Sequence, residues 1–320
     1  MAEILEASKE AIERAASILK NGGLVAFPTE TVYGLGASAL NPKAVARVFE
    51  VKNRPSFDPF IVHIANPSDL EQLCSKVGSK ANKLIDAFWP GPLTLVLPKS
   101  ELIPDIVTAG NTSIAVRMPS HPIALELIRQ TGLPIAAPSA NPFSRLSPTT
   151  AAHVESQIGA KIDLIIDGGS CSIGVESTVI ELGEEAVLLR PGGITIEELE
   201  AVIGPVRNSF SSTKPHSPGQ LLHHYSPNTR LKIVENGKII FPEGIKAGLL
   251  SFRGNGNNSR FDTVEVLSES GDLYQAASNL FSALHRLDVS ELDIIYAESI
   301  PELGIGMAIM DRLKKAEHKF

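Results

Sequence analysis

Two cations stand close together just before a proline in the first third of the chain. Lys52 and Arg54 precede Pro55 in the segment 51–60, and a residue before proline is displaced from helical geometry. We therefore expect this stretch to be extended, so that both side chains project from one side. A mobile ammonium and a planar guanidinium at this spacing suit a polyphosphate. The alternative is a solvated helix exit, because most charged side chains lie on protein surfaces.

Other cations and hydroxyls close short apolar runs further along the chain. Arg117 lies near the end of the run 113–119, and Arg190 follows the run 187–189. The segment 137–141 brings small and hydroxyl residues directly after another apolar run, and small side chains let a ligand approach the backbone. Polar residues at the tips of several strands are how an α/β enzyme lines a crevice.

His63 interrupts the apolar run 60–64 and can be interpreted in two ways. A histidine inside such a run is more often a core residue whose hydrogen bonds are satisfied. Here, its nearness in sequence to Lys52 and Arg54 supports a role in the same pocket just as well. Both interpretations stay open from the sequence alone.

The segment 28–36, Pro-Thr-Glu-Thr-Val-Tyr-Gly-Leu-Gly, follows the apolar run 24–27 and precedes a helix-like stretch. That order is typical of a loop at the carboxyl end of a strand, where open α/β sheets bind ligands. The glycines also fit the loose dinucleotide pattern G-x-G-x-x-A, but six residues separate the end of the strand from the first of them, too many for the tight turn of that pattern. The sequence therefore favours a ligand loop over a dinucleotide site or a simple structural turn.

Residues 205–230 lose all periodicity, and Pro, Ser, His and Lys dominate there, so we predict a linker. Tyr225 and the pair His223 and His224 are unusual in a flexible tether, which indicates that the linker is not merely a spacer. Adjacent side chains of an extended segment point apart, which argues against zinc at the two histidines. Residues 231–320 alternate again and predict a small α/β domain.

Composition describes an acidic globular protein. The chain has 320 residues, 43% hydrophobic and 20% charged, and a formal net charge of −7. This acidity argues against a broad nucleic-acid surface. No apolar run approaches the length of a membrane span, and the N-terminal residues show no secretory signal. Cys74 and Cys171 form no disulfide framework. We expect a cytoplasmic protein without membrane contact.

Seven short motifs follow one another through the first two thirds of the chain. They lie at 28–36, 52–55, 89–94, 115–119, 137–141, 174–178 and 189–192. Together they closely resemble the YrdC-like L-threonylcarbamoyladenylate synthase family, and several motifs in order are far more specific than one. The tail resembles the long form of that family, which has a linker and a C-terminal domain.

The resemblance implies a fold in the α/β class with three parts. Residues 1–204 would form the YrdC-like catalytic domain, a large open twisted mixed sheet with helices. Residues 205–230 would be the linker and active-site lid, and residues 231–320 a smaller Rossmann-like α/β domain.

The resemblance also implies the reaction. The enzyme would be a nucleotidyltransferase, L-threonylcarbamoyladenylate synthase, which condenses L-threonine, bicarbonate or CO2, and ATP with release of pyrophosphate. Its product would pass to a separate threonylcarbamoyl transferase complex for N6-threonylcarbamoyladenosine modification of tRNA next to the anticodon. ATP would enter as a substrate with Mg2+ on its phosphates, and no protein metal site or prosthetic group is expected.

The resemblance assigns residues to both substrates. The catalytic residues would be Lys52 and Arg54. The ATP-binding residues would be Lys52, Arg54, Asp58, Ser113, Ser139, Ser147, Arg190 and Tyr225. The threonine-binding residues would be Thr31, His63, Arg117, Ala137 and Ser177, with Arg117 forking the carboxylate. Both reactants are anionic, so cations that offset their charge and hold them together are the main requirement.

Two other functions fit parts of the sequence. An RNA-binding or translation-associated protein could use a groove lined by arginines, including Arg145, but the net acidity argues against it. Direct tRNA binding is therefore only a weak expectation. A carbamoyl-adenylate-forming maturation enzyme would share the ATP pocket, but that family resembles a much larger chain with zinc-finger cysteines that are missing here.

Overall fold

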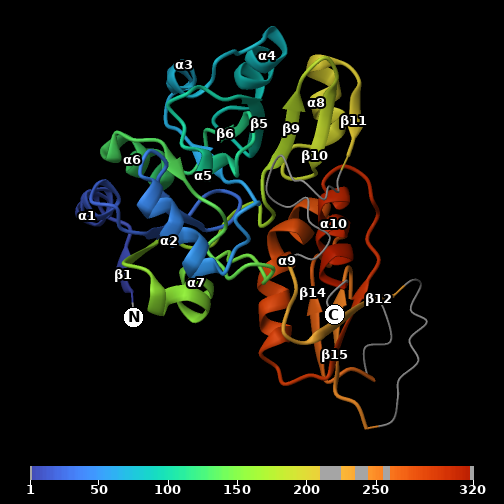
Figure 1. Ribbon diagram of the computed structural model, residues 1–320. Coiled ribbons are helices and arrows are strands. Elements are labelled where there is room, and N and C mark those ends of the chain that lie inside the picture. The colour runs from blue at the N-terminus through green and yellow to red at the C-terminus, as the bar shows by residue number, and fades with distance from the viewer. Residues whose placement is uncertain (1, 210–224, 235–243, 255–259, 318–320) are drawn as a thin grey trace.

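The computed structural model describes residues 2–209, 225–234, 244–254 and 260–317. Within these residues the chain forms two β-sheets, and each sheet has its own helices. Figure 1 shows the two parts side by side, the larger coloured blue to yellow and the smaller orange to red. The predicted α/β class, with a second and smaller α/β domain, is confirmed.

The larger sheet is mixed, and the described residues supply eleven strands to it. In spatial order they are β1 (Glu3–Glu6), β8 (Leu164–Asp167), β2 (Val25–Phe27), β3 (Gly34–Ser38), β7 (Ile135–Ala136), β4 (Ile61–His63), β6 (Ser113–Arg117), β5 (Leu93–Pro98), β9 (Thr178–Leu182), β10 (Ala186–Arg190) and β11 (Val206–Asn208). The strands β4 and β6 are parallel, and their register pairs His63 with Arg117. The sheet itself therefore places these two predicted site residues side by side.

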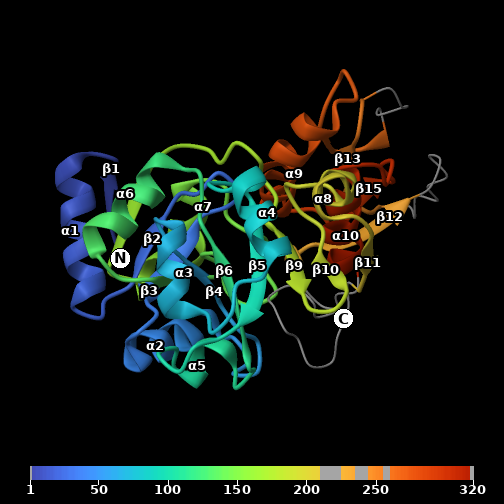
Figure 2. The same cartoon turned by 90° about the horizontal axis from the view of Figure 1, so that it is seen from above.

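Helices flank the larger sheet, as Figure 2 shows from above. They are α1 (Lys9–Lys20), α2 (Pro42–Lys52), α3 (Leu70–Leu73), α4 (Ser79–Phe88), α5 (Asp105–Thr108), α6 (Pro122–Thr131), α7 (Ala151–Ile158) and α8 (Ile196–Ile203). Side chains next to the helix ends explain where several of them begin. Ser8 caps α1, Asn41 caps α2 ahead of Pro42, and Thr195 and Glu198 form a capping box at α8.

The chain after β2 differs from the prediction. We expected residues 28–36 to be a loop that leads into a helix, but Gly34–Ser38 is the strand β3, antiparallel to β2. A Cβ on Gly36 would lie 2.8 Å from the Phe27 ring, so the glycine permits close packing within this hairpin. Because the glycines lie in a strand and α2 begins only at Pro42, they do not form a dinucleotide-binding turn.

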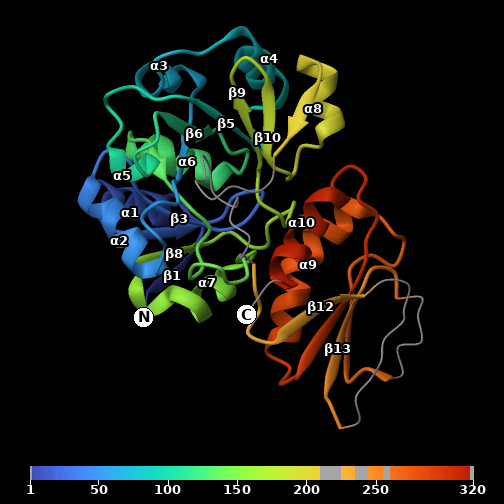
Figure 3. The same ribbon diagram turned by 45° about the vertical axis from the view of Figure 1, so that its right-hand side comes forward.

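All described strands of the smaller sheet are parallel, and two helices separate this sheet from the larger part of the protein (Figure 3). Its strands are, in spatial order, β12 (Arg230–Val234), β15 (Ile294–Glu298), β13 (Ala247–Ser251) and β14 (Thr263–Val266). The helices α9 (Leu273–Asp288) and α10 (Gly306–Glu317) lie between this sheet and the larger part (Figure 3). Leu280, Phe281 and Leu284 of α9 are buried in the core of this small domain.

The predicted linker, residues 205–230, is only partly described. Its first residues form β11, which pairs with β10, so the larger sheet extends past the predicted domain boundary. Residues 210–224 lie outside the described residues, and with them His223 and His224 of the predicted lid. Tyr225, the first described residue after 224, is buried, with 1% of its surface exposed.

The two parts share a hydrophobic cluster where they meet. Val32, Leu146 and Val175 belong to loops of the larger part but are buried in the same cluster as the core residues of α9 and α10. The backbones approach even more closely at Gly174, where a Cβ would lie 2.5 Å from the Ala277 carbonyl oxygen of α9. The loop before β9 is therefore packed directly against the second domain.

This close approach predicts a loss of stability in a single variant. Gly174 has φ +77° and its added Cβ would meet the α9 backbone, so Gly174→Ala should destabilise the protein by roughly 2–4 kcal/mol through strain and overpacking. Gly110 is the matched control, because its φ is +79° and no described atom lies within 4 Å of an added Cβ. Gly110→Ala should cost only ~1–2 kcal/mol. Calorimetric unfolding measures both, and equal losses would contradict the close packing.

Candidate active site

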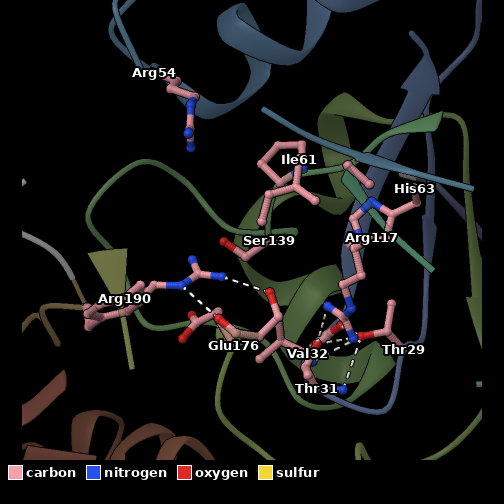
Figure 4. A pocket seen from close by; sticks show the side chains of 15 residues that line it. Thr29, Thr31, Val32, Arg54, Ile61, His63, Arg117, Ser139, Glu176 and Arg190 are labelled. Atoms are coloured by element: carbon pink, nitrogen blue, oxygen red, sulfur yellow. Dashed lines mark hydrogen bonds between the residues drawn. The ribbon is translucent and has the colours of Figure 1, made fainter. Parts of the chain in front are cut away.

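One cavity collects side chains from several strand ends, as Figure 4 shows. It is lined by Thr29, Thr31, Val32, Gly34, Arg54, Ile61, His63, Arg117, Ala137, Pro138, Ser139, Glu176, Ser177, Arg190 and Tyr225. All five residues predicted for threonine are among them, namely Thr31, His63, Arg117, Ala137 and Ser177. Four of those predicted for ATP are also among them, namely Arg54, Ser139, Arg190 and Tyr225.

Arg117 is fixed by three neighbours. Its Nη2 donates to Glu30 Oε1 at 2.6 Å, its Nη1 to Thr31 Oγ1 at 3.0 Å and its Nε to the Gly91 carbonyl at 3.2 Å. A guanidinium has five N–H donors, so these contacts with described residues leave two donors for a ligand. Burial alone would raise the pKa of Glu30, but the charge and hydrogen bond of Arg117, together with backbone hydrogen bonds from Glu30 and Ser120, lower this pKa. Glu30 is therefore an ionised partner that holds Arg117 toward the cavity.

His63 lies beside Arg117 and is neutral. Burial is the main cause that lowers its pKa to about 3, and the positive charge of Arg117 adds to it. An imidazole with that pKa carries no charge at neutral pH and offers one donor and one acceptor. The sequence left open whether His63 is a core residue or part of the pocket. In the structure, His63 lines the cavity.

Arg190 reaches the cavity across the loop before β9. Its Nε donates to the Ser177 carbonyl at 3.0 Å and its Nη2 to Ser177 Oγ at 3.0 Å. The same hydroxyl lies 2.8 Å from Thr94 Oγ1. A Cβ on Gly192 would lie 2.4 Å from the Glu176 carbonyl oxygen, so glycine is required for this approach. The arginine and the serine predicted for different substrates are therefore in contact.

Arg54 lines the cavity from the loop after α2, and Asp58 lies behind it. Arg54 Nη2 is 2.9 Å from Asp58 Oδ2, and its Nε donates to the Asp58 carbonyl at 3.1 Å. Its guanidinium also lies 5.0 Å from the centroid of the Phe60 ring. Asp58 is fully buried and does not line the cavity. In the structure it is the counter-ion of Arg54, whereas we predicted a direct contact with the nucleotide.

Lys52 also lies behind the cavity wall, which corrects the geometry expected from the sequence. We expected an extended stretch with Lys52 and Arg54 on one side, but Lys52 is the last residue of α2 and Asn53 has a left-handed φ of 51°. Lys52 Nζ donates to the Ser139 carbonyl at 2.6 Å and to the Asn141 carbonyl. Lys52 is 1% exposed and does not line the cavity, so it supports the loop that carries Ser139.

The other residues predicted for ATP lie at different distances from the cavity. Tyr225 lines the cavity although it lies in the predicted linker. Ser147 lies just outside the cavity and donates to Glu176 Oε1 at 2.5 Å. Ser113 is at the opposite end of β6 from Arg117, about 13 Å away at the usual rise per residue. Strand alternation places both on one face of the sheet.

Sequence reasoning assigned two acidic residues of the site to neither substrate, although it expected the loop 28–36, which contains Glu30, to form a polar pocket wall. Glu30 holds Arg117, and Glu176 lines the cavity itself. Both lie inside the motifs 28–36 and 174–178, so their position next to predicted site residues was the available signal. Burial alone would raise the pKa of Glu176, but Arg312 and then Arg190 lower it to about 2.

Comparison with known proteins gives two family matches that together span most of the chain. Residues 17–192 match the Sua5/YciO/YrdC family, described as "Telomere recombination". Residues 194–317 match the family described as "Threonylcarbamoyl-AMP synthase, C-terminal domain".

Similar whole proteins agree with these matches. The threonylcarbamoyl-AMP synthases of Pyrococcus abyssi and Bacillus subtilis are each 46% identical over 319 residues, covering 95% of this chain and 93% and 92% of theirs. The crystal structure of P. abyssi Sua5 complexed with L-threonine superposes with a TM-score of 0.91 at 43% identity, covering 99% of this chain and 97% of that one. This chain therefore belongs to the Sua5/YciO/YrdC family, in the form that also carries the threonylcarbamoyl-AMP synthase C-terminal domain.

Proposed function

We propose that the cavity binds L-threonine and ATP side by side, and that the chain is a threonylcarbamoyl-AMP synthase. The reaction consumes L-threonine, CO2 or bicarbonate, and ATP, and it releases pyrophosphate. The observation that carries the proposal is the convergence of Arg54, Arg117 and Arg190 on one cavity with hydroxyl groups between them. We assign the enzyme to the nucleotidyltransferases, because an AMP group is transferred to a carbamate oxygen.

The main obstacle to this reaction is electrostatic repulsion between its two negatively charged reactants. A carbamate and a nucleoside triphosphate are both negatively charged, so they repel each other unless fixed cations lie around them. The three arginines of the cavity are 7%, 3% and 4% exposed for Arg54, Arg117 and Arg190. Away from bulk water, such charges act more strongly and are already oriented when the reactants arrive.

We place threonine at Arg117. The two remaining donors of its guanidinium match the two oxygens of a carboxylate. The walls around it contain Thr31, His63, Ala137 and Ser177, which offer hydrogen bonds and a small apolar surface for the threonine side chain. The P. abyssi protein, whose chain superposes closely on this one, was crystallised with L-threonine, which supports L-threonine as a ligand of this chain.

We place the phosphates of ATP between Arg54 and Arg190, with Ser139 and Tyr225 beside them. Lys52 and Asp58 lie behind the cavity wall. Lys52 holds the Ser139 loop through a hydrogen bond, and Asp58 holds Arg54 through an ion pair. Ser147 supports the site through Glu176.

The nucleoside would extend from the phosphates along the face of β6 toward Ser113. On this face of β6, Ala115 lies between Arg117 and Ser113, and it pairs with Ile61 of β4 and Val96 of β5 in one buried apolar cluster. Contact of Ser113 with the nucleotide stays a prediction, because Ser113 does not line the cavity.

The chemistry proceeds in two steps. The threonine amine attacks the carbon of CO2 and loses a proton, which leaves a carbamate. A carbamate oxygen then attacks the α-phosphorus of ATP in line, and pyrophosphate leaves with the electron pair of the broken bond. At neutral pH neither His63, with a pKa of about 3, nor Glu176, with a pKa of about 2, is a suitable base for an ammonium group. We therefore assign the cavity to positioning and charge neutralisation.

Several further points belong to the same proposal. Mg2+ would arrive with ATP, and among the described residues no group of three or more His, Cys, Asp or Glu side chains could hold a metal ion. The unstable product would pass to a threonylcarbamoyl transferase complex that modifies tRNA. No described helix is long and apolar enough to span a membrane, and a cytoplasmic location stays a prediction.

A direct test uses the purified chain with ATP, L-threonine and 14C-bicarbonate. We expect a labelled adenylate and one pyrophosphate per product, with no product when threonine is omitted. An RNA-binding protein without this activity would instead bind tRNA in a salt-dependent way and form no labelled adenylate.

Arg54→Ala should abolish ATP-dependent and threonine-dependent pyrophosphate release. The variant removes a preorganised cation from the transferred phosphate, an effect of roughly 100-fold or more on kcat/KM. Arg47→Ala is the matched control, because Arg47 is a half-exposed arginine of α2 outside the cavity. Full activity of Arg54→Ala would remove this residue from the mechanism.

Arg117→Lys separates the two substrates. Lysine keeps a positive charge beside Glu30 but cannot fork a carboxylate, so threonine affinity should fall by roughly 10-fold or more. The ATP affinity should stay within about 2-fold in isothermal titration calorimetry, because Arg117 is assigned to threonine only. An equal loss for both ligands would contradict this placement.

A further inference from the structure

A buried cluster of charged residues joins the second domain to the active site. Arg312 of α10 is 1% exposed, and its Nε donates to Glu176 Oε2 at 2.8 Å. Its Nη1 donates to the Pro191 carbonyl at 2.9 Å and to Asp311 Oδ2 at 2.8 Å. Its guanidinium also lies 5.1 Å from the centroid of the Tyr225 ring. One side chain of the second domain thus contacts three segments of the site.

These three segments carry residues that line the cavity. Glu176 and Tyr225 line it directly, and Pro191 follows Arg190, which also lines it. The two carboxylate oxygens of Glu176 are divided between partners, with Oε1 held by the Ser147 hydroxyl and Oε2 by Arg312. Glu176 is only 5% exposed, so its negative charge depends on these partners rather than on water.

The negative charge of Glu176 stands in a cavity that must accept anions. If Arg312 did not pair with it, Arg190 could take its place, because after Arg312 it is the cation whose charge acts most strongly on Glu176. Arg190 would then be drawn away from the phosphates, and the carboxylate would repel them. Pairing with Arg312 prevents both effects.

We infer that Arg312 is a positioning residue for ATP: by pairing with Glu176 it neutralises the one acidic side chain in the described lining and keeps Arg190 available for phosphate. This inference rests on the proposed function and gives the second domain a part in the active site. Arg312 does not line the cavity, so it acts through Glu176, Tyr225 and the chain at Pro191.

The test is a double-mutant cycle in the full chain with Arg312→Met, Glu176→Gln and both together. ATP affinity is measured by isothermal titration calorimetry, and KM for ATP and kcat by pyrophosphate release. Arg312→Met should raise the Kd and KM for ATP by about 10-fold or more, because a buried carboxylate loses its partner. Adding Glu176→Gln should restore ATP affinity to within about 3-fold of the wild type, since the unpaired charge is removed.

Several outcomes would overturn the inference. A KM for ATP in Arg312→Met equal to that of the wild type would do so, as would a double variant that binds ATP no better than Arg312→Met. A fall in kcat alone, with KM for ATP unchanged, would mean a general structural role. Arg286→Met is the matched control, because Arg286 of α9 pairs with Glu265 at the surface and should leave ATP binding unchanged.

If Arg312→Met does not fold, Arg312→Lys carries the test. Its single ammonium cannot reproduce the paired contacts with Glu176 and Pro191, so ATP affinity should fall by about 3-fold or more while threonine affinity stays unchanged. An unchanged ATP affinity would contradict the inference. A wild-type chain that forms no adenylate would refute the proposed function instead, and this control separates the two failures.

Discussion

Three buried guanidinium groups in or next to the cavity are each held by a carboxylate, and this pairing organises the site. Arg117 pairs with Glu30, Arg54 with Asp58 and Arg312 with Glu176. Burying an unpaired charge costs several kcal/mol, so each arginine is held where its partner is held. The carboxylates thus hold the guanidinium groups of Arg54 and Arg117 at the cavity wall, while Arg190 is held there by the Ser177 carbonyl and hydroxyl.

Much of this arrangement could be predicted from residue order. The end of β6 and the end of β10 were expected to present Arg117 and Arg190 to one crevice, because polar residues at strand tips line the crevice of an α/β enzyme. Lys52 was placed wrongly because α2 continues to that residue, and proline three positions later did not end the helix sooner. A sequence pattern indicates whether an element is a helix or a strand more reliably than it indicates the residue at which that element ends.

The role of the second domain could not be predicted in this way. Arg312 lies in a run of charged residues, Asp311 to Lys315, that in sequence is typical of a solvated helix face. Only tertiary packing shows that α10 faces the catalytic part and buries this arginine (Figure 3). The second domain thus covers apolar loops of the larger part and also neutralises a charge within the site.

The central claim is that Arg54 and Arg190 hold the phosphates while Arg117 holds the carboxylate of threonine. A crystal structure of the full chain with L-threonine and a non-hydrolysable ATP analogue tests it most directly. The account predicts phosphate oxygens within hydrogen-bond distance of both Arg54 and Arg190, and a threonine carboxylate forked by Arg117. Triphosphate bound elsewhere, with neither Arg54 nor Arg190 in contact with it, would contradict the account.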